Sequence, residues 1–155
     1  MATAVFFHAH PDDESIATGG TMVIGARRGH RIVLVCATDG AVGEADPDMI
    51  PEGETLADVR ARELAAAADE LSVSRLEFLG YKDSGMENTP TNDDPDCFWQ
   101  ADVEEAAERL ARILREEQAD IVTIYDPIGG YNHPDHIQVH RVGKRAAELA
   151  GTPHV

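Results

Sequence analysis

Residues 3–38, TAVFFHAHPDDESIATGGTMVIGARRGHRIVLVCAT, contain the pattern that decides the fold. Two short apolar runs, Thr3–Phe7 and Arg31–Thr38, flank a segment, Glu14–Arg28, that has the character of a helix. Continuous apolar runs of this length are typical of strands that are buried on both faces of a parallel sheet. A helix that joins two such strands makes a crossover connection. This stretch therefore predicts the first unit of a layered α/β domain.

The same alternation continues along the rest of the chain. Further strands are expected at Arg75–Leu79 and Asp120–Tyr125, and further helices at Leu56–Leu71, Ala101–Glu117 and Pro134–Ala150. We predict an α/β fold of three layers, α/β/α, built on a Rossmann-like, doubly wound, mostly parallel sheet. One domain over residues 1–155 is expected from the length. Two long loops, 39–55 and 80–99, interrupt the alternation, and loops of this length usually line a functional site or are disordered.

Composition excludes several classes of partner. The chain has 29 acidic residues against 13 Lys and Arg, which gives a net charge of −16. Such a surface repels phosphates, so we expect no nucleic-acid partner and no docking on an anionic membrane. The two cysteines, Cys36 and Cys97, provide no disulfide framework and no cysteine-based zinc site. No apolar stretch is long enough to span a bilayer and no signal peptide is apparent, so a cytoplasmic enzyme or binding domain is expected.

The tripeptide His-Pro-Asp occurs twice, each time ahead of a predicted helix. AHPDDE at residues 9–14 follows the first strand, and HPDH at residues 133–136 follows the fourth. Proline is favoured at the first position of a helix, which places His10 and His133 at the N-caps. In a doubly wound sheet the first and fourth strands are often neighbours, and ligands bind beyond their carboxyl ends. Both turns are therefore expected to face the same crevice.

The side chains of these two turns have the composition of an open zinc site. Two neutral imidazoles and one carboxylate are a common ligand set for zinc, with the remaining positions left to water and substrate. His10 and Asp13 could supply two ligands from the first turn, and His136 could supply the third from the second turn. A metal held there would lower the pKa of a bound water toward about 7 and polarise a carbonyl oxygen.

The remaining side chains of the two turns suit proton transfer. Asp12 is adjacent to a proposed ligand and is itself unassigned, so it is available as the general base. His133 fits a cationic imidazole that stabilises an oxyanion or protonates a leaving amine. Asp135 could orient His133 and raise its pKa. The two helix N-termini would add positive potential that favours a developing oxyanion.

At these residues the sequence resembles the LmbE/PIG-L family of zinc-dependent N-deacetylases, whose hallmark motifs are AHPDDE and HPDH. The resemblance covers essentially the whole chain. The stretches Gly80–Met86, Asp102–Ala107 and Tyr125–Tyr131 are similar to the actinobacterial deacetylase of mycothiol biosynthesis and to the related mycothiol S-conjugate amidase. The resemblance implies hydrolysis of an N-acetyl group on a small N-acetylglucosamine-type conjugate. It implies Zn²⁺ as the cofactor, with Fe²⁺ or another divalent ion as an alternative in the cell.

The resemblance also implies roles for individual residues. The six side chains of the two turns divide into zinc ligands (His10, Asp13, His136), a general base (Asp12), and a group that acts on the oxyanion and leaving amine with its partner (His133, Asp135). Tyr131 matches a tyrosine that polarises the substrate carbonyl, and Arg60 and Asp83 match positions that contact sugar hydroxyls. Structural alternatives are packing for Tyr131, a helical ion pair for Arg60 and a turn for Asp83.

Three alternatives stay open at this point. Family members usually continue well past the last helix, whereas this chain ends at Val155 and looks shortened, so a non-catalytic metal- or sugar-binding remnant is one alternative. A conjugate amidase is the second. A phospho-acceptor receiver domain is the third, although it needs an acceptor aspartate where the third strand ends in Phe78–Gly80. A second copy of this chain could cover the exposed edge strand, which would give a homo-oligomer.

Overall fold

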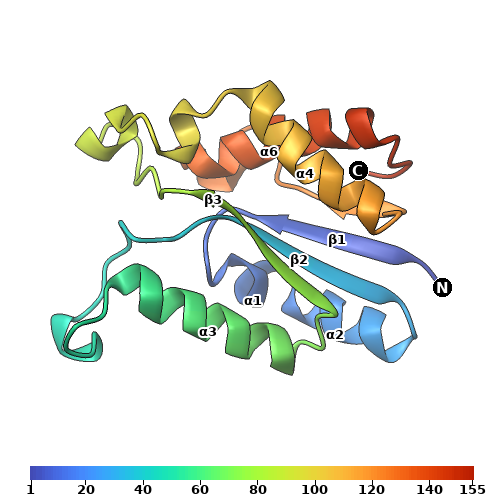
Figure 1. The fold of residues 1–155 in the computed structure, drawn as a ribbon, viewed down its shortest axis with the longest axis horizontal. Helices are drawn as coiled ribbons and strands as arrows, with labels where there is room; N and C mark the ends of the chain where they lie inside the picture. Colours follow the sequence, from blue (N-terminus) through green and yellow to red (C-terminus); the bar gives the residue numbers. More distant parts are fainter.

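A four-stranded, all-parallel sheet forms the middle layer of the computed structural model, which describes residues 1–155 (Figure 1). Its strands are β1 (Thr3–His8), β2 (Arg31–Thr38), β3 (Arg75–Tyr81) and β4 (Ile121–Thr123), in the spatial order β3-β2-β1-β4. The chain moves outward from β1 to β3 and then returns to place β4 on the other side of β1. The predicted doubly wound α/β fold is therefore confirmed, with its point of reversal between β1 and β4.

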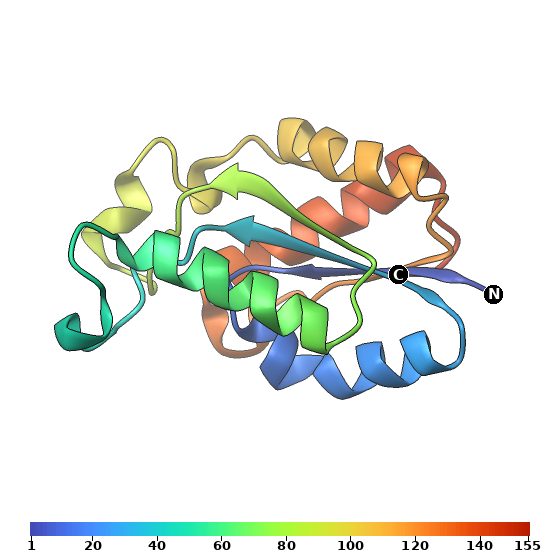
Figure 2. The same cartoon turned by 60° about the horizontal axis from the view of Figure 1, so that its bottom comes forward.

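Helices cover both faces of this sheet (Figures 1 and 2). One face carries α1 (Asp13–Ala17), α2 (Gly19–Arg27) and α3 (Leu56–Glu70), and the other carries α4 (Val103–Glu116) and α6 (Pro134–Ala150). The connections contain the short turns η1 (Pro47–Met49), η2 (Pro90–Asp93), η3 (Phe98–Gln100) and α5 (Gly129–Asn132). No helix has the length and apolarity that a membrane crossing requires.

Strand alternation divides the buried side chains into two cores. Successive residues of a strand point to opposite faces, so Val5 and Phe7 enter the core beneath α4 and α6, whereas Phe6 enters the core above α2 and α3. Leu110 of α4 and Leu64 of α3 are buried against these two faces. Each such side chain contributes about 1.5–3 kcal/mol when it is fully buried. Both layers of helices are thus held to one central sheet.

Several predicted boundaries differ in the structure, among them the end of β3, which is Tyr81 instead of Leu79. The expected helix Glu14–Arg28 is interrupted at Thr18, where α1 ends and α2 begins. The hydroxyl of Thr18 lies 2.8 Å from Nε2 of His8, and two weak helix formers, Gly19 and Gly20, follow it. The fourth strand spans Ile121–Thr123 instead of Asp120–Tyr125, because its pairing with β1 runs only from Ala4–Ile121 to Phe6–Thr123. The helix break at Thr18 and the end of β4 both lie beside the candidate site.

Candidate active site

The two His-Pro-Asp turns lie side by side at the carboxyl ends of β1 and β4. These strands pair in parallel, with Phe6 opposite Thr123, so the turns that follow them start at the same edge of the sheet. His133 is the N-cap of α6, as expected, and its Nδ1 accepts the backbone N–H of Asp135 at 3.2 Å. The expected N-cap at His10 is wrong, because α1 begins later and Asp12 occupies its N-cap position.

Asp13 contacts both of the other proposed metal ligands, His10 and His136. A carboxylate oxygen of Asp13, Oδ2, lies 3.5 Å from Nδ1 of His10 and 3.5 Å from Nε2 of His136. His10, His133 and His136 are all buried, and one ring nitrogen from each lies within 4.8 Å of the others. A second buried group, His10, Asp83, His133 and Asp135, also has ligand-type atoms within 4.8 Å of one another.

One atom in this cluster shows that the residues fit a metal ion. Nε2 of His136 is buried and has no hydrogen-bond partner. A buried polar atom without a partner costs free energy, so such atoms usually mark an unplaced water or ion. The donor set of imidazoles and carboxylates is also the set that zinc and similar divalent ions prefer. The structure therefore supports a metal site at this cluster.

The charged groups of the cluster shift the pKa values of His10 and Asp13 in opposite directions. Burial acts to lower the pKa of His10, but contacts with Asp13, Asp135 and Asp83 raise it well above its usual value. Burial acts to raise the pKa of Asp13, but its hydrogen bond with His10 holds it far below the usual range. The carboxylates around His10 thus favour a positive charge at this position. A divalent ion would supply the same positive charge to the same carboxylates.

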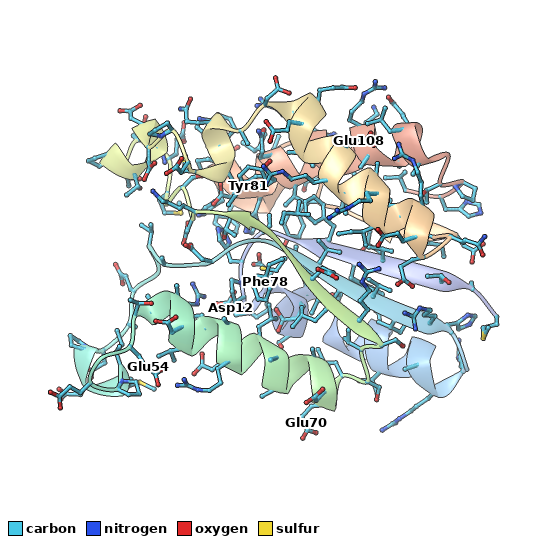
Figure 3. All side chains as sticks on the ribbon, viewed as in Figure 1. Asp12, Glu54, Glu70, Phe78, Tyr81 and Glu108 are labelled. Carbon is cyan, nitrogen blue, oxygen red and sulfur yellow. The ribbon has the colours of Figure 1, made fainter.

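Asp12 (labelled in Figure 3) lies next to the proposed ligand Asp13, and its backbone and an arginine hold it in place. Its φ of 119° is uncommon for a residue other than glycine, and such strain concentrates at functional sites. Its N–H donates to Oε2 of the buried Glu14 at 2.9 Å, and Nη2 of Arg60 donates to its Oδ2 at 2.5 Å. Burial raises the pKa of Asp12, and Arg60 opposes that shift.

The carboxylate of Asp135 faces a different histidine from the one expected. Its Oδ2 lies 3.0 Å from Nε2 of His10, and both of its oxygens are bonded by Ser84. Only the backbone N–H of Asp135 bonds His133. The charge of Asp135 does act to raise the pKa of His133, as expected. Burial and the neighbouring His10 lower that pKa to about 4, and the charge of Asp135 does not outweigh them.

Arg60 reaches the site from α3 and fastens the first turn. Its guanidinium donates to the carbonyl oxygens of Gly40, at 2.8 Å, and Pro11, at 2.9 Å, as well as to Asp12. These contacts leave its Nε–H and one Nη1 N–H without a partner in the protein. Arg60 is thus at the site, as expected, but most of its contacts are with the protein itself.

Asp83 and Tyr131 also reach the site. Asp83 is buried, accepts the backbone N–H groups of Val42 at 3.2 Å and Gly85 at 2.9 Å, and lies 3.5 Å from Nε2 of His10. Tyr131 is 59% exposed, and its ring centre lies 5.0 Å from that of His136. It lines a cavity of about 250 Å³ that opens beside the proposed metal ligands.

A buried polar network behind the site was not anticipated from the sequence. Nδ1 of His8 lies 2.7 Å from the hydroxyl of Tyr125, and the Tyr125 ring stacks on His136 with ring centres 4.5 Å apart. Burial lowers the pKa of His8 to about 4. The alternation in HAH, which puts His8 and His10 on one face of the strand, is the signal that could have identified His8. Ser84, fully buried, is the second residue that was missed.

The chain is similar in sequence to a known protein family and to curated deacetylases. The sequence profile described as PIG-L, GlcNAc-PI de-N-acetylase, matches residues 5–147. A 1D-myo-inositol 2-acetamido-2-deoxy-α-D-glucopyranoside deacetylase of Catenulispora acidiphila is 48% identical over 158 aligned residues, covering 94% of this chain and 48% of that relative. The chain spans about half the length of the curated relatives it matches.

Two solved structures show the same fold with different chemistry. The N,N'-diacetylchitobiose deacetylase of Pyrococcus horikoshii is 27% identical, with a TM-score of 0.72 over 97% of this chain and 53% of that one. The 4-carboxy-2-hydroxymuconate hydratase of Pseudomonas putida KT2440 is 26% identical, with a TM-score of 0.72 over 96% of this chain and 56% of that one. The site, rather than the fold, must therefore carry the argument for function.

Proposed function

Because the chain belongs to the PIG-L/LmbE family, we propose that it is a metal-dependent amide hydrolase that removes an N-acetyl group from an N-acetylglucosamine-type conjugate. The observation that carries this proposal is the contact of Asp13 with both His10 and His136 in a buried cluster of histidines, with Asp12 next to Asp13 in the chain. The curated relatives are named as deacetylases of an inositol-linked 2-acetamido sugar, which makes such a conjugate the first substrate to test.

His10, Asp13 and His136 would hold the metal. Two imidazoles and one carboxylate leave positions for water and substrate, and this set favours Zn²⁺, with Fe²⁺ as the alternative. A bound divalent ion supplies a water of lowered pKa and polarises the amide carbonyl. The three side chains come from α1, α6 and the turn after β1, so all three are set by one edge of the sheet.

Asp12 is the proposed general base. Its carboxylate is about half exposed at the edge of the cluster, so it can reach a water molecule that enters from solvent. Arg60 holds one carboxylate oxygen and leaves the other to accept the proton. The proton taken from water can then pass from Asp12 to the nitrogen of the leaving amine, which balances the hydrolysis of the amide bond.

His133 is the proposed donor to the oxyanion. Because its Nδ1 accepts a backbone N–H, a neutral ring carries its proton on Nε2. The lowered pKa favours this neutral form near pH 7. A neutral Nε2–H can donate a hydrogen bond to a developing negative oxygen without a net charge on the ring. Tyr131, at the open side, is proposed to act on the same carbonyl through its hydroxyl.

The polar rim beside Asp12 is the proposed sugar-binding side. Arg60 has unused N–H donors there that can bond sugar hydroxyls. Asp83 is buried, but its carboxylate oxygens keep lone pairs beyond the backbone N–H groups that they accept, and it is the second proposed contact. Two of the proposed metal ligands, Asp13 and His136, line the same cavity as Tyr131. A sugar bound on the rim would present its 2-acetamido group to the cluster.

The decisive experiment measures metal content and amine release together. Purified protein loaded with Zn²⁺ is incubated with N-acetylglucosaminyl-inositol, with a mycothiol S-conjugate and with a panel of N-acetyl sugars. Release of glucosaminyl-inositol supports the proposal, and preferential cleavage of the S-conjugate supports an amidase instead. No turnover on any of them with one zinc bound would overturn hydrolysis and favour a binding protein. His136→Ala is the control, because it should lose the metal.

A further inference from the structure

Ser84 is a fully buried polar residue at the centre of the loop between β3 and η2. Every polar atom that it has is bonded. Its carbonyl oxygen accepts from the side chains of Thr91 at 2.8 Å and Asn92 at 2.6 Å, and its hydroxyl oxygen accepts the backbone N–H of Trp99 at 2.9 Å. The backbone N–H and the hydroxyl of Ser84 are therefore left as donors.

Both of these donors are used on one carboxylate. The backbone N–H of Ser84 donates to Oδ2 of Asp135 at 2.9 Å, and its hydroxyl donates to Oδ1. The pair of bonds fixes the plane of a carboxylate that is itself completely buried. A single serine in the third connection of the sheet thus orients an acidic side chain in the first turn of α6, 51 residues away.

The fixed carboxylate in turn determines how His10 presents its ring. An ionised carboxylate only accepts hydrogen bonds, so the contact of 3.0 Å between Asp135 Oδ2 and His10 Nε2 requires the proton on Nε2. Asp83 Oδ1, 3.5 Å from the same nitrogen, favours the same arrangement. When the ring is neutral, its lone pair is then on Nδ1, the nitrogen that faces Asp13.

We propose that Ser84 is a positioning residue of the metal centre, which acts through Asp135 to fix the His10 tautomer that leaves Nδ1 free to bind the metal. The inference rests on the metal site of the proposed function, but not on its substrate. Partners of this kind fix the orientation of a ligating histidine and raise its basicity. The role differs from that expected for Asp135 in the sequence, where its partner was His133.

The first test measures metal affinity instead of activity. The apoprotein is titrated with Zn²⁺ in competition with a chromophoric chelator, for the wild type and for Ser84→Ala. Loss of the hydroxyl leaves Oδ1 of Asp135 without that donor, and we expect the affinity for Zn²⁺ to fall about 10- to 100-fold. Thr91→Ala is the matched control, because it removes a hydroxyl that bonds the same residue without touching Asp135. It should change the affinity less than twofold.

The second test reads the tautomer directly and does not depend on how a serine variant folds. Nitrogen-15 NMR of the zinc-loaded wild type should show the His10 proton on Nε2 and the metal on Nδ1. In Asp135→Asn, the side-chain amide can donate to Nε2 and drive the proton to Nδ1, and the affinity for Zn²⁺ should fall at least as far as in Ser84→Ala.

The outcomes separate this inference from the proposed function. A lower affinity for Zn²⁺ in Ser84→Ala but not in Thr91→Ala, with the His10 proton on Nε2 in the wild type, supports the role of Ser84. This holds even if no substrate is cleaved. Equal affinities for Ser84→Ala, Thr91→Ala and the wild type would overturn it. A wild-type His10 with its proton on Nδ1 would also overturn it, whatever the activity.

Discussion

At the scale of single residues, Asp12 is the side chain whose geometry is least explained by packing. It is exposed and has a strained backbone, and two side chains hold this part of the turn through three contacts. Glu14 accepts the N–H of Asp12, and Arg60 donates to the Asp12 carboxylate and to the carbonyl oxygen of Pro11. Strain of this kind costs about 1–3 kcal/mol and persists only where surrounding contacts impose it. The proposed function of Asp12 in proton transfer would account for a carboxylate in this position.

Replacing Asp12 by asparagine should separate catalysis from metal binding. Asp12→Asn keeps the shape of the side chain but removes its ability to accept a proton. We expect the zinc content to stay at the wild-type value and kcat to fall about 10²- to 10⁴-fold. Metal analysis measures the zinc content and amine release measures kcat. The control is Asp69→Asn, which changes an exposed carboxylate on α3, away from the site. Loss of zinc from Asp12→Asn would instead make Asp12 a ligand.

The pKa of His8 predicts how stability depends on pH. Its folded-state pKa is lowered to about 4, whereas an unfolded chain titrates near 6.5. Between these values the unfolded state binds a proton that the folded state does not. The free energy of unfolding should therefore decrease as pH falls from 6.5 toward 4, by up to about 1.4 kcal/mol per pH unit from this group. Above pH 6.5 the group has no effect.

The contribution of His8 is measured as a difference between two proteins, because other histidines titrate in the same range. Gln keeps one donor and one acceptor but carries no proton to titrate. Urea unfolding at pH 5 and pH 7 should show a smaller loss of stability for His8→Gln than for the wild type. An identical loss in both proteins would contradict the buried, neutral state of His8.

At the scale of elements, the close approach of α6 to the sheet positions His133 and His136. Gly143 lies in the middle of this helix, where a Cβ atom would come within 2.3 Å of Cγ2 of Ile124 and 3.3 Å of the Phe7 ring. Only glycine therefore allows the helix to lie this near to the end of β4. The packing of one helix thus sets the distance between the second turn and the first.

A methyl group at this contact should push α6 away from the sheet. We expect Gly143→Ala to lower the free energy of unfolding by about 1–3 kcal/mol, the usual cost of overpacking. Gly20→Ala is the matched control, since Gly20 lies in α2 with no atom within 4 Å of the added Cβ. That change should raise stability by up to about 1 kcal/mol. Equal unfolding free energies in urea for the two variants would contradict the close contact.

At the scale of the whole molecule, the metal would join elements that come from both halves of the chain. The proposed ligands lie on the turn after β1, on α1 and on α6, and those elements are otherwise connected through the sheet. A ligand that binds only the folded state stabilises it in proportion to the logarithm of its concentration. The ion should therefore stabilise the entire fold as well as activate water.

Metal removal should be visible in thermal unfolding. At a free zinc concentration 100 times Kd, the stabilisation is about 2.7 kcal/mol, which corresponds to a rise in Tm of roughly 5–10 °C for a domain of this size. A chelator should reverse the rise, and His136→Ala should show none. The same rise in His136→Ala as in the wild type would place the zinc elsewhere on the protein.

Much of this molecule follows from local patterns in its sequence. Apolar runs and helical periodicity predict the four parallel strands and the main helices, because strand and helix formation depend on residues close together in the chain. The two His-Pro-Asp turns predict the composition of the site, and the order of the elements predicts that His10 and His133 meet. The family resemblance, confirmed by the profile over residues 5–147, follows from those same motifs.

Only the tertiary structure decided how the side chains of the site are paired. The bonds of Asp135 with His10 and Ser84 join residues 125 and 51 positions apart, and no local pattern specifies which of two histidines a carboxylate will face. The break at Thr18 likewise depends on its contact with His8. The pKa of His133 falls because burial outweighs a nearby charge, and burial is a property of the assembled fold. Local chemistry thus determined which residues gather, and packing determined what each one does to its neighbours.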